Sequence, residues 1–358
     1  MTIFTRIAAA LGRRPCNEPE ISKPVGVSPE ALAGEGRFAA AIDLASDLNR
    51  AVRNPELERQ LVGWRRAAFK TLPPAVGRPD WPPVLPDPFP GLVGVPEIPR
   101  DQLSADVLGG AILHHGCLIV RGLLSEPEAD QRRADIDRAF DGFDAFWDRA
   151  RAGEPPSAWY NPFPEPIDDD MSNARQFVRE GEGVWTAESP PVLFDVIEGF
   201  KAAGVQSAIA GFLGEAPVIS LGKSTLRRVP TTTGTDWHQD GSFMGADIRT
   251  VNVWLALSHC GEDAPGLDIV ARRLPGLVES GTPGAYFPWS VAPDRAVAAA
   301  DGAPIVSPLF APGDAVLFDH LCLHRTGVRP GMTKTRYAIE SWFFAPSAYA
   351  SKQVPLAF

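Results

Sequence analysis

The sequence of 358 residues contains few cysteines, and their spacing fits no metal or disulfide motif. The four residues, Cys16, Cys117, Cys260 and Cys322, lie far apart and include no C-x-x-C pair. This spacing argues against a zinc finger and against a small fold held by disulfides. A chain that works in the reducing cytoplasm is therefore expected.

Long apolar runs and an excess of positive charge are also missing. No stretch approaches the roughly 20 apolar residues of a membrane-spanning helix. Lys and Arg number 34 against 44 Asp and Glu, a net charge of −10, so attraction to nucleic acid or to an anionic membrane is not expected. Segment 3–14 carries Arg6 in its middle and further charge after it, which is the wrong order for a secretory signal. A short amphipathic helix is favoured, with a transit peptide as the alternative.

Proline, by contrast, is abundant, with 36 residues. Ser28 and Pro29 form a helix start, an N-cap serine followed by proline at the first helical position, and apolar residues at helical spacing continue to about Lys70. The many prolines of 72–100 disfavour a helix or a central strand. They predict an extended arm packed on the core, with a proline-rich ligand for a partner domain as the alternative. Residues 1–104 are thus expected to form a helical and proline-rich extension.

The remaining residues, 105–358, are expected to form one larger domain. Residues 116–124 predict a buried strand, and Ser125-Glu126-Pro127-Glu128 fits the capping box of a following helix. Helical spacing returns at 191–213, and strand patterns predominate afterwards. Between the helices, 159–185 is a polar stretch without a regular pattern; it predicts either a cover over the mouth of a cavity or a solvated loop.

A histidine and a carboxylate stand two residues apart in Trp237-His238-Gln239-Asp240-Gly241. In an extended strand residues i and i+2 face the same side. His238 and Asp240 are therefore expected to point into one cavity, with Gln239 facing away. Two imidazoles and one carboxylate are the protein ligands of a non-haem Fe(II) site that leaves other positions open, so a second, distant histidine is needed.

That second histidine is expected to be His324. It follows the apolar run Ala315-Val316-Leu317-Phe318-Asp319, which predicts a buried strand ending nearby. His320 is the alternative ligand. His324 is preferred because Arg325-Thr326-Gly327 follow it, and because Arg336 stands a short distance further on.

These motifs belong to a series of sequence blocks that follow one another over roughly residues 105–345. The ordered blocks are Gly116-Cys117-Leu118-Ile119-Val120-Arg121-Gly122-Leu123-Leu124-Ser125, Trp237-His238-Gln239-Asp240-Gly241, Val253-Trp254-Leu255-Ala256-Leu257, and Gly313-Asp314-Ala315-Val316-Leu317-Phe318-Asp319 with His324-Arg325-Thr326-Gly327 and Arg336. Together they resemble the phytanoyl-CoA dioxygenase family.

The resemblance implies a mainly β core, a double-stranded β-helix (jelly-roll) with flanking α-helices. It also implies an enzyme that uses Fe(II), 2-oxoglutarate and O2 to hydroxylate a C–H bond of a small-molecule substrate, with release of succinate and CO2. His238, Asp240 and His324 would hold the iron. Arg336 and Thr326 would hold the distal carboxylate of 2-oxoglutarate, and a planar guanidinium suits that role because it binds a carboxylate through two hydrogen bonds.

Strand alternation adds further candidates for the cavity wall. Within 251–258, Asn252 and Trp254 share the mixed face, so they are expected to line the cavity and help hold the cosubstrate. Glu340 shares a face with Arg336 and is expected inside, where it needs a partner: a second arginine, or a cationic or hydroxylated substrate. The alternative is a bulge that turns Glu340 to solvent.

Other basic residues near Arg336 are weaker candidates. Arg325, Arg329 and Lys334 fall in or beside a polar stretch with proline and glycine, which favours loop charges in contact with solvent. Asp240 itself favours hydroxylation over halogenation, because the related iron halogenases have a small residue in place of this carboxylate.

Two departures from the family pattern concern the substrate. Gly266-Leu267-Asp268-Ile269-Val270-Ala271-Arg272-Arg273-Leu274 replaces a Pro-Gly-Ser-His turn, and Val328-Arg329-Pro330-Gly331 replaces a frequent asparagine. The phytanoyl-CoA substrate is therefore not carried over. Two alternatives of other classes remain: a catalytically silent binding or regulatory member, and a cupin-like metalloenzyme without a keto acid, which would have no need of Arg336.

Overall fold

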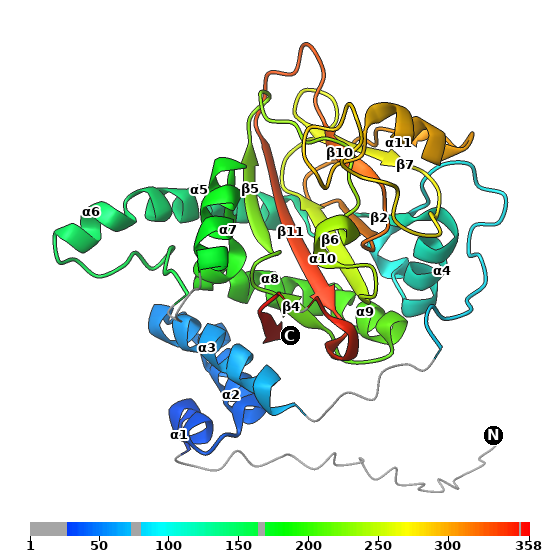
Figure 1. Cartoon of the computed structure of the whole chain (residues 1–358). Coiled ribbons are helices and arrows are strands. Elements are labelled where there is room, and N and C mark those ends of the chain that lie inside the picture. The colour runs from blue at the N-terminus through cyan, green and yellow to red at the C-terminus, as the bar shows by residue number, and fades with distance from the viewer. Residues whose placement is uncertain (1–26, 73–79, 164–168, 351) are drawn as a thin grey trace, which may run out of the picture.

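The computed structural model describes residues 27–72, 80–163, 169–350 and 352–358, so the helix expected at 3–14 lies outside the described residues. Its strands form a larger and a smaller sheet (Figure 1). The larger sheet contains β1 (Glu97–Pro99), β2 (Cys117–Arg121), β3 (Gly183–Trp185), β4 (Val218–Ser220), β5 (Thr225–Val229), β6 (Thr250–Ala256), β9 (Ala315–Phe318), β11 (Arg336–Phe344) and β12 (Pro355–Ala357). The smaller sheet contains β7 (Gly266–Val270), β8 (Ile305–Val306) and β10 (His324–Gly327).

The order of strands is that of a jelly-roll. The larger sheet runs β1-β2-β9-β6-β11-β4-β12, with β5 beside β11 and β3 beside β5, and the smaller runs β10-β7-β8. All pairs are antiparallel except β1 with β2. The expected double-stranded β-helix with flanking helices is confirmed.

Most helices belong to the N-terminal extension or lie along the larger sheet, whereas α11 lies beside the smaller sheet (Figure 1). The described helices are α1 (Pro29–Gly34), α2 (Phe38–Ala51), α3 (Pro55–Thr71), α4 (Ala105–His115), α5 (Glu126–Asp144), α6 (Phe146–Arg151), α7 (Asp169–Glu180), α8 (Pro190–Ala202), α9 (Val205–Leu213), α10 (Gly241–Met244) and α11 (Pro293–Ala300). Among them, none combines the length and the apolar character that crossing a membrane requires.

The helical pattern predicted from Ser28 to about Lys70 is divided into three helices. Ser28 caps α1 as expected, with its Oγ accepting a hydrogen bond from the Ala31 N–H. Gly36, at a φ of 75°, turns the chain after α1, which glycine does without the steric cost of a Cβ. Asn54 then starts α3, because its side chain accepts hydrogen bonds from the first-turn N–H groups.

The proline-rich segment packs on the core of its own chain. In its described part, Trp81, Leu85 and Phe89 contact the main hydrophobic core, and the Nε2 atom of His114 in α4 lies 2.8 Å from the Leu85 carbonyl oxygen. The reading of this segment as an arm on the core is confirmed for residues 80–96.

The central strand β6 separates the helical core from the interior between the sheets. Val251, Val253 and Leu255 belong to the cluster packed under the helices. Trp254 and Ala256 belong to the second cluster, which includes residues of both sheets. The alternation predicted from the sequence is therefore confirmed, and the side chains of the second set face the site described below.

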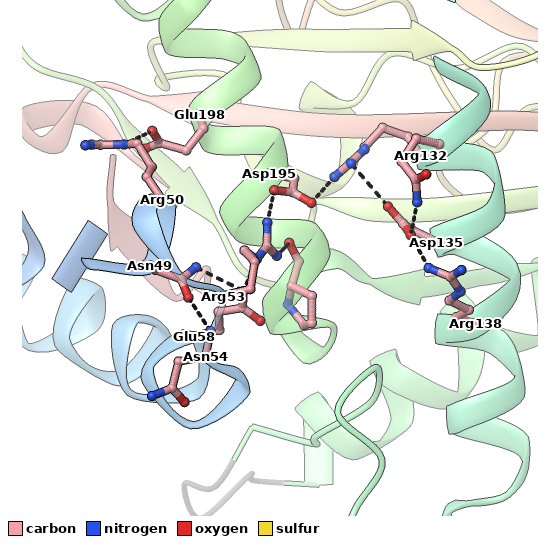
Figure 2. A network of polar contacts seen from close by, with 12 residues as sticks. Asn49, Arg50, Arg53, Asn54, Glu58, Arg132, Asp135, Arg138, Asp195 and Glu198 are labelled. Carbon is pink, nitrogen blue, oxygen red and sulfur yellow. Dashed lines mark hydrogen bonds and ion pairs between the residues drawn. The ribbon is translucent and has the colours of Figure 1, made fainter. Parts of the chain in front are cut away.

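A network of ion pairs joins the extension to helices of the larger domain (Figure 2). Arg53, at the end of α2, contacts the buried carboxylate of Glu58, with 2.6 Å between Nε and Oε1, and also contacts Asp195 of α8. Arg132 of α5 contacts the other oxygen of Asp195 and extends the network to the buried Asp135. One α8 carboxylate is thus shared by the extension and by the core.

Candidate metal centre and cavity

The two candidate ligand histidines are joined through their backbones. The His238 N–H donates to the His324 carbonyl at 2.9 Å, and the His324 N–H donates to the His238 carbonyl at 3.1 Å. This isolated antiparallel bridge connects β10 to a segment that is otherwise outside any named strand. Two residues 86 positions apart in the sequence, from 238 to 324, therefore become direct neighbours.

Asp240 reaches the same place by a different route from the one expected. Its backbone is helical, with φ −62° and ψ −23°, and it caps the short helix α10. Gly241 follows at a close approach, because a Cβ there would stand 2.7 Å from the Leu277 side chain and 3.0 Å from that of His320. The extended-strand explanation for His238 and Asp240 is wrong, and a tight turn directs the carboxylate into the cavity instead.

His238, Asp240 and His324 together form a group that could hold a metal ion. One ligand atom from each residue lies within 4.8 Å of the others. In the described part of the chain, no other cluster of three or more His, Cys, Asp or Glu residues has this geometry. The Nε2 atom of His324 stands 3.8 Å from Oδ2 of Asp240. His320 lies nearby but is not part of this group, and its Nε2 atom stands 3.1 Å from the Ala246 carbonyl oxygen.

Backbone carbonyl groups orient both imidazoles. The Nδ1 atom of His238 lies 2.8 Å from the Asp236 carbonyl oxygen, and that of His324 lies 3.1 Å from the Cys322 carbonyl oxygen. Because a carbonyl only accepts, each Nδ1 carries the proton and each Nε2 keeps a lone pair for a metal. Burial also lowers the pKa of His238, which favours the neutral, metal-binding form, and it raises the pKa of Asp240.

Gln239, between the two ligands, fixes the loop on the opposite side. Its side chain is fully buried, and its amide donates to the carbonyls of Gly276 and Leu321 at 3.1 and 2.7 Å. Its oxygen accepts from the Val278 N–H at 2.6 Å. The expectation that Gln239 faces away is confirmed, and the side chain satisfies three backbone groups that would otherwise be unpaired.

Arg336 lies at the closed end of the interior, on β11. It is 1% exposed, and its Nη1 atom donates to the Gly266 carbonyl at 3.3 Å and approaches Oγ1 of Thr326 at 3.5 Å. Burial lowers the pKa of Arg336 to about 10. Three buried polar atoms near this end have no described partner: Nε of Arg336, Nε1 of Trp254 and Oδ1 of Asn252.

The rival basic residues are already paired elsewhere. Arg325 and Arg329 both contact Asp268 of β7, at 2.9 and 2.6 Å. Lys334 is exposed and pairs with Asp263 at 2.8 Å. Arg336 differs from these three because no ion pair with a described residue is seen, and its Nε is buried without a hydrogen bond. The Nε of Arg227 also has no hydrogen bond, but it lies 3.6 Å from the Glu340 carboxylate.

A cavity of about 500 Å³ opens from the three candidate ligands. Asn252, Trp254 and Thr326 line it, whereas Arg336 stands behind them. Glu340 faces this interior as expected, where its Oε2 accepts from the Thr225 hydroxyl at 3.0 Å and its Oε1 lies 3.6 Å from Nε of Arg227. Burial alone would raise the pKa of Glu340, but the charges of Arg227 and Arg336 lower it.

Several lining residues were not found from the sequence. They are Lys223 and Arg227 near the β4–β5 turn, and the aromatic residues Phe243, Phe287 and Trp289. Phe243 stands close behind Asp240 in the chain, a position that could have identified it. Lys223 reaches the cavity only through the turn between strands, and the sequence pattern gives no indication of it.

The polar stretch 159–185 is more regular than expected, because it contains α7 and β3. Phe177 and Val178 of α7 line the cavity. Arg175 anchors the helix to Glu188, a fully buried carboxylate, with 3.0 Å from Nε to each of its two oxygens. The prediction of an irregular segment is therefore wrong for α7, although the helix does contribute to the cavity wall.

Comparison with known proteins agrees with this architecture. The model of the phytanoyl-CoA dioxygenase family, PhyH, matches residues 112–329. No curated protein sequence matches the chain. Similar solved structures include EctD from S. alaskensis, crystallised with 2-oxoglutarate and 5-hydroxyectoine, at 15% identity over 78% of this chain and 95% of that one, with a TM-score of 0.47.

Two further structures show a weaker likeness. AviO1 from Streptomyces viridochromogenes is 17% identical over 69% of this chain and 97% of that one, with a TM-score of 0.40. SnoK, a non-haem α-ketoglutarate-dependent carbocyclase from nogalamycin biosynthesis, is 15% identical over 68% of this chain and 85% of that one, with a TM-score of 0.43. With the family model covering more than half of its length, the chain belongs to the phytanoyl-CoA dioxygenase family of Fe(II)- and 2-oxoglutarate-dependent oxygenases.

Proposed function

We propose that this protein is a hydroxylase, which replaces a C–H bond of a small molecule with C–OH. The observation that carries the proposal is the convergence of His238, Asp240 and His324 at one wall of a cavity. Arg336 lies behind the lining of this cavity, next to Thr326. The same residues that the family resemblance assigns to iron and keto acid are thus brought together from separate segments.

The donor set fits the metal. Two neutral imidazole nitrogens and one carboxylate oxygen, arranged as three corners of one face, suit non-haem Fe(II) and leave room for other ligands. A cation among them would also relieve the cost of burying Asp240, whose pKa burial raises although the charges of His324 and Lys223 partly oppose the shift.

The closed end of the interior fits 2-oxoglutarate. The unpaired N–H groups of Arg336 and Trp254, with the Thr326 hydroxyl, are donors that suit a carboxylate. Asn252 lines the same cavity, and its amide N–H groups are further donors for an anionic ligand. An isolated buried donor is costly, so a carboxylate beside Arg336 and Trp254 would offset two such costs at once.

When bound, iron and 2-oxoglutarate supply an oxidant made from O2: one oxygen atom enters succinate as CO2 leaves, and the other enters the product. The role of the chain is to bind and orient. Arg336 and Thr326 hold the keto acid in one direction, and the aromatic groups Trp254, Phe318 and Trp342 keep water from the interior. Asp240 fills the position that a halide would need, which supports hydroxylation.

Anaerobic visible absorption tests the metal and cosubstrate sites. Adding Fe(II) and then 2-oxoglutarate to the wild type should produce a charge-transfer band that requires both. His324→Ala should abolish the band. Arg336→Ala should raise the concentration of 2-oxoglutarate needed to form it, and the exposed control Lys352→Gln should behave as the wild type. If the folded wild type gives no band, a catalytically silent family member is favoured. If the protein binds the metal and adding 2-oxoglutarate changes nothing, a cupin-like enzyme is favoured.

The reaction itself needs a second readout. Turnover with heavy-isotope O2 and a screened substrate should give a product heavier by one labelled oxygen atom, together with succinate in equal amount. A product without added oxygen, formed in step with succinate, would retain the oxygenase cofactors and overturn the hydroxylase proposal.

A further inference from the structure

Lys223 places an uncompensated positive charge in the cavity. It lies in the turn between β4 and β5, where its N–H donates to the Ser220 hydroxyl at 3.1 Å and fixes the turn. Its Nζ atom stands 4.0 Å from the ring centroid of Phe243. Among the described residues, no hydrogen bond or ion pair of this ammonium group is seen, although the side chain lines the cavity.

The other charged side chains of the cavity wall that are shielded from solvent compensate one another. Arg227 lies 3.6 Å from Glu340, which also accepts a hydrogen bond from Thr225. Glu180 of α7 also lines the cavity, but it is exposed, so solvent screens its charge. Among the described lining residues that are not exposed, Lys223 is the one whose charge has no ion-pair partner.

Loading the site would leave this imbalance in place. The two positive charges of Fe(II) and the charge of Arg336 equal the negative charges of Asp240 and the dianionic keto acid, while both histidines are neutral. Arg227 and Glu340 cancel as well. Apart from the exposed, solvent-screened Glu180, the loaded cavity therefore retains one positive charge, that of Lys223. A partly buried ammonium without a partner is unfavourable.

An aromatic wall stands beside this charge. Phe243 is stacked near His238 with 6.4 Å between ring centroids, and Trp289 meets both rings edge-on. Phe287 lies parallel to Trp289, at 4.7 Å and an interplanar angle of 7°. Flat, rigid surfaces of this kind favour an apolar or ring-containing body over a small polar one.

We infer that the substrate is a monocarboxylate with an apolar, ring-containing body, and that Lys223 binds its carboxylate while the wall of Phe243 and Trp289 holds the body beside the metal centre. The inference rests on the proposed function, because the charge balance includes iron and keto acid. A carboxylate is favoured over a phosphate monoester because the latter carries close to two negative charges at neutral pH and would overcompensate a single lysine.

Calorimetric titration of the anaerobic protein loaded with Fe(II) and 2-oxoglutarate provides the test. The probes are benzoate, naphthoate, hydrocinnamate and cyclohexanecarboxylate, each paired with its uncharged primary amide, and phenyl phosphate as the doubly charged arm. The wild type should bind at least one carboxylate about tenfold more tightly than its amide, as a charge-assisted hydrogen bond predicts. Lys223→Gln should lose this preference, Lys223→Arg should keep most of it, and the exposed control Lys352→Gln should retain it fully.

Three outcomes would overturn the inference. One is a wild type that prefers no carboxylate of the panel over its amide or prefers phenyl phosphate, and another is a Lys223→Gln variant that keeps the carboxylate preference. The third is a Lys223→Gln variant with weakened binding of 2-oxoglutarate itself, which would assign Lys223 to the cosubstrate. The charge-transfer band separates these results from a failure of the proposed function, because a band in both wild type and Lys223→Gln leaves the oxygenase reading intact.

Discussion

The guanidinium carbon of Arg336 lies 5.6 Å from the ring centroid of Trp254, and both side chains keep a buried N–H without a described partner. Two unpaired donors at one end of a buried interior are costly. The pair is therefore the part of the site where binding of a keto acid is expected to relieve the cost of unpaired donors.

Arg336→Gln should weaken the binding of 2-oxoglutarate about 100-fold, because losing one partner of a buried charge pair costs about 2–5 kcal/mol. Arg336→Lys should recover only part of the affinity, since lysine cannot form two parallel hydrogen bonds. The measurement is the keto acid dependence of the charge-transfer band. Arg329→Gln is the matched control, because Arg329 pairs with Asp268; an equal loss in that variant would contradict the assignment of Arg336.

Gln239→Leu should lower the free energy of unfolding by about 3 kcal/mol, since three buried backbone groups would lose their partner at about 1–3 kcal/mol each. The contacts concerned are those with Gly276, Leu321 and Val278. Denaturant unfolding measures the change. The exposed Gln102→Leu should stay within about 0.5 kcal/mol of the wild type, and a similar result for Gln239→Leu would show that the loop is held by other contacts.

Arg53→Ala should loosen the attachment of the N-terminal helices to α8. Arg53 contacts Asp195 across that boundary and also the buried Glu58 (Figure 2). Because Arg53 is 45% exposed and Asn49 still donates to Glu58, the expected loss is only about 1 kcal/mol. Limited proteolysis of residues 27–72 should accelerate.

Arg59→Ala is the control for this change. Arg59 pairs with the exposed Glu56 within α3, and an exposed pair of this spacing contributes about 0.3–0.5 kcal/mol. Its proteolysis should match the wild type. Equal protection of the Arg53→Ala variant would indicate that apolar contacts alone hold the extension.

Asp268→Asn should destabilise the protein in a pH-dependent manner. Burial would raise the pKa of Asp268, but hydrogen bonds from Ser307, Arg325 and Arg329 lower it below the ordinary value of 3.8. A carboxyl with a lowered folded pKa stabilises the fold above its unfolded pKa and loses that effect as the pH falls through the folded value. The difference in unfolding free energy between wild type and variant, about 2 kcal/mol, should thus be constant above about pH 5 and shrink below 3.8. If the difference in unfolding free energy between wild type and variant grew as the pH fell, the pKa of Asp268 would not be lowered in the folded protein.

Strand alternation was the most informative sequence pattern because its physical basis is simple. Successive side chains of a strand face opposite sides, and this correctly placed Asn252 and Trp254 on the cavity face of β6. The same rule placed Glu340 inside with Arg336. Its failure at Asp240 shows its limit, since that residue is in a helical turn while still pointing into the cavity.

The missed features depend on contacts through space. The position of α7 is set by a buried pair, Arg175 with Glu188, and by an aromatic contact of Arg175 with Trp185. The local pattern of a polar stretch does not predict an ion pair with a residue further along the chain. Lys223 is similar, because a lysine in a turn is usually solvated, and only the folded chain shows that this turn adjoins the cavity.

The backbone bridge between His238 and His324 holds two of the three candidate ligands together through hydrogen bonds to which a metal ion contributes nothing. A site prepared in this way cannot choose its metal by folding around it, and by the general order of affinities Cu(II), Ni(II) and Zn(II) bind nitrogen and oxygen ligands more tightly than Fe(II). The protein therefore depends on the supply of iron for correct loading. Purification in the presence of zinc or nickel should yield a folded, fully occupied and inactive protein.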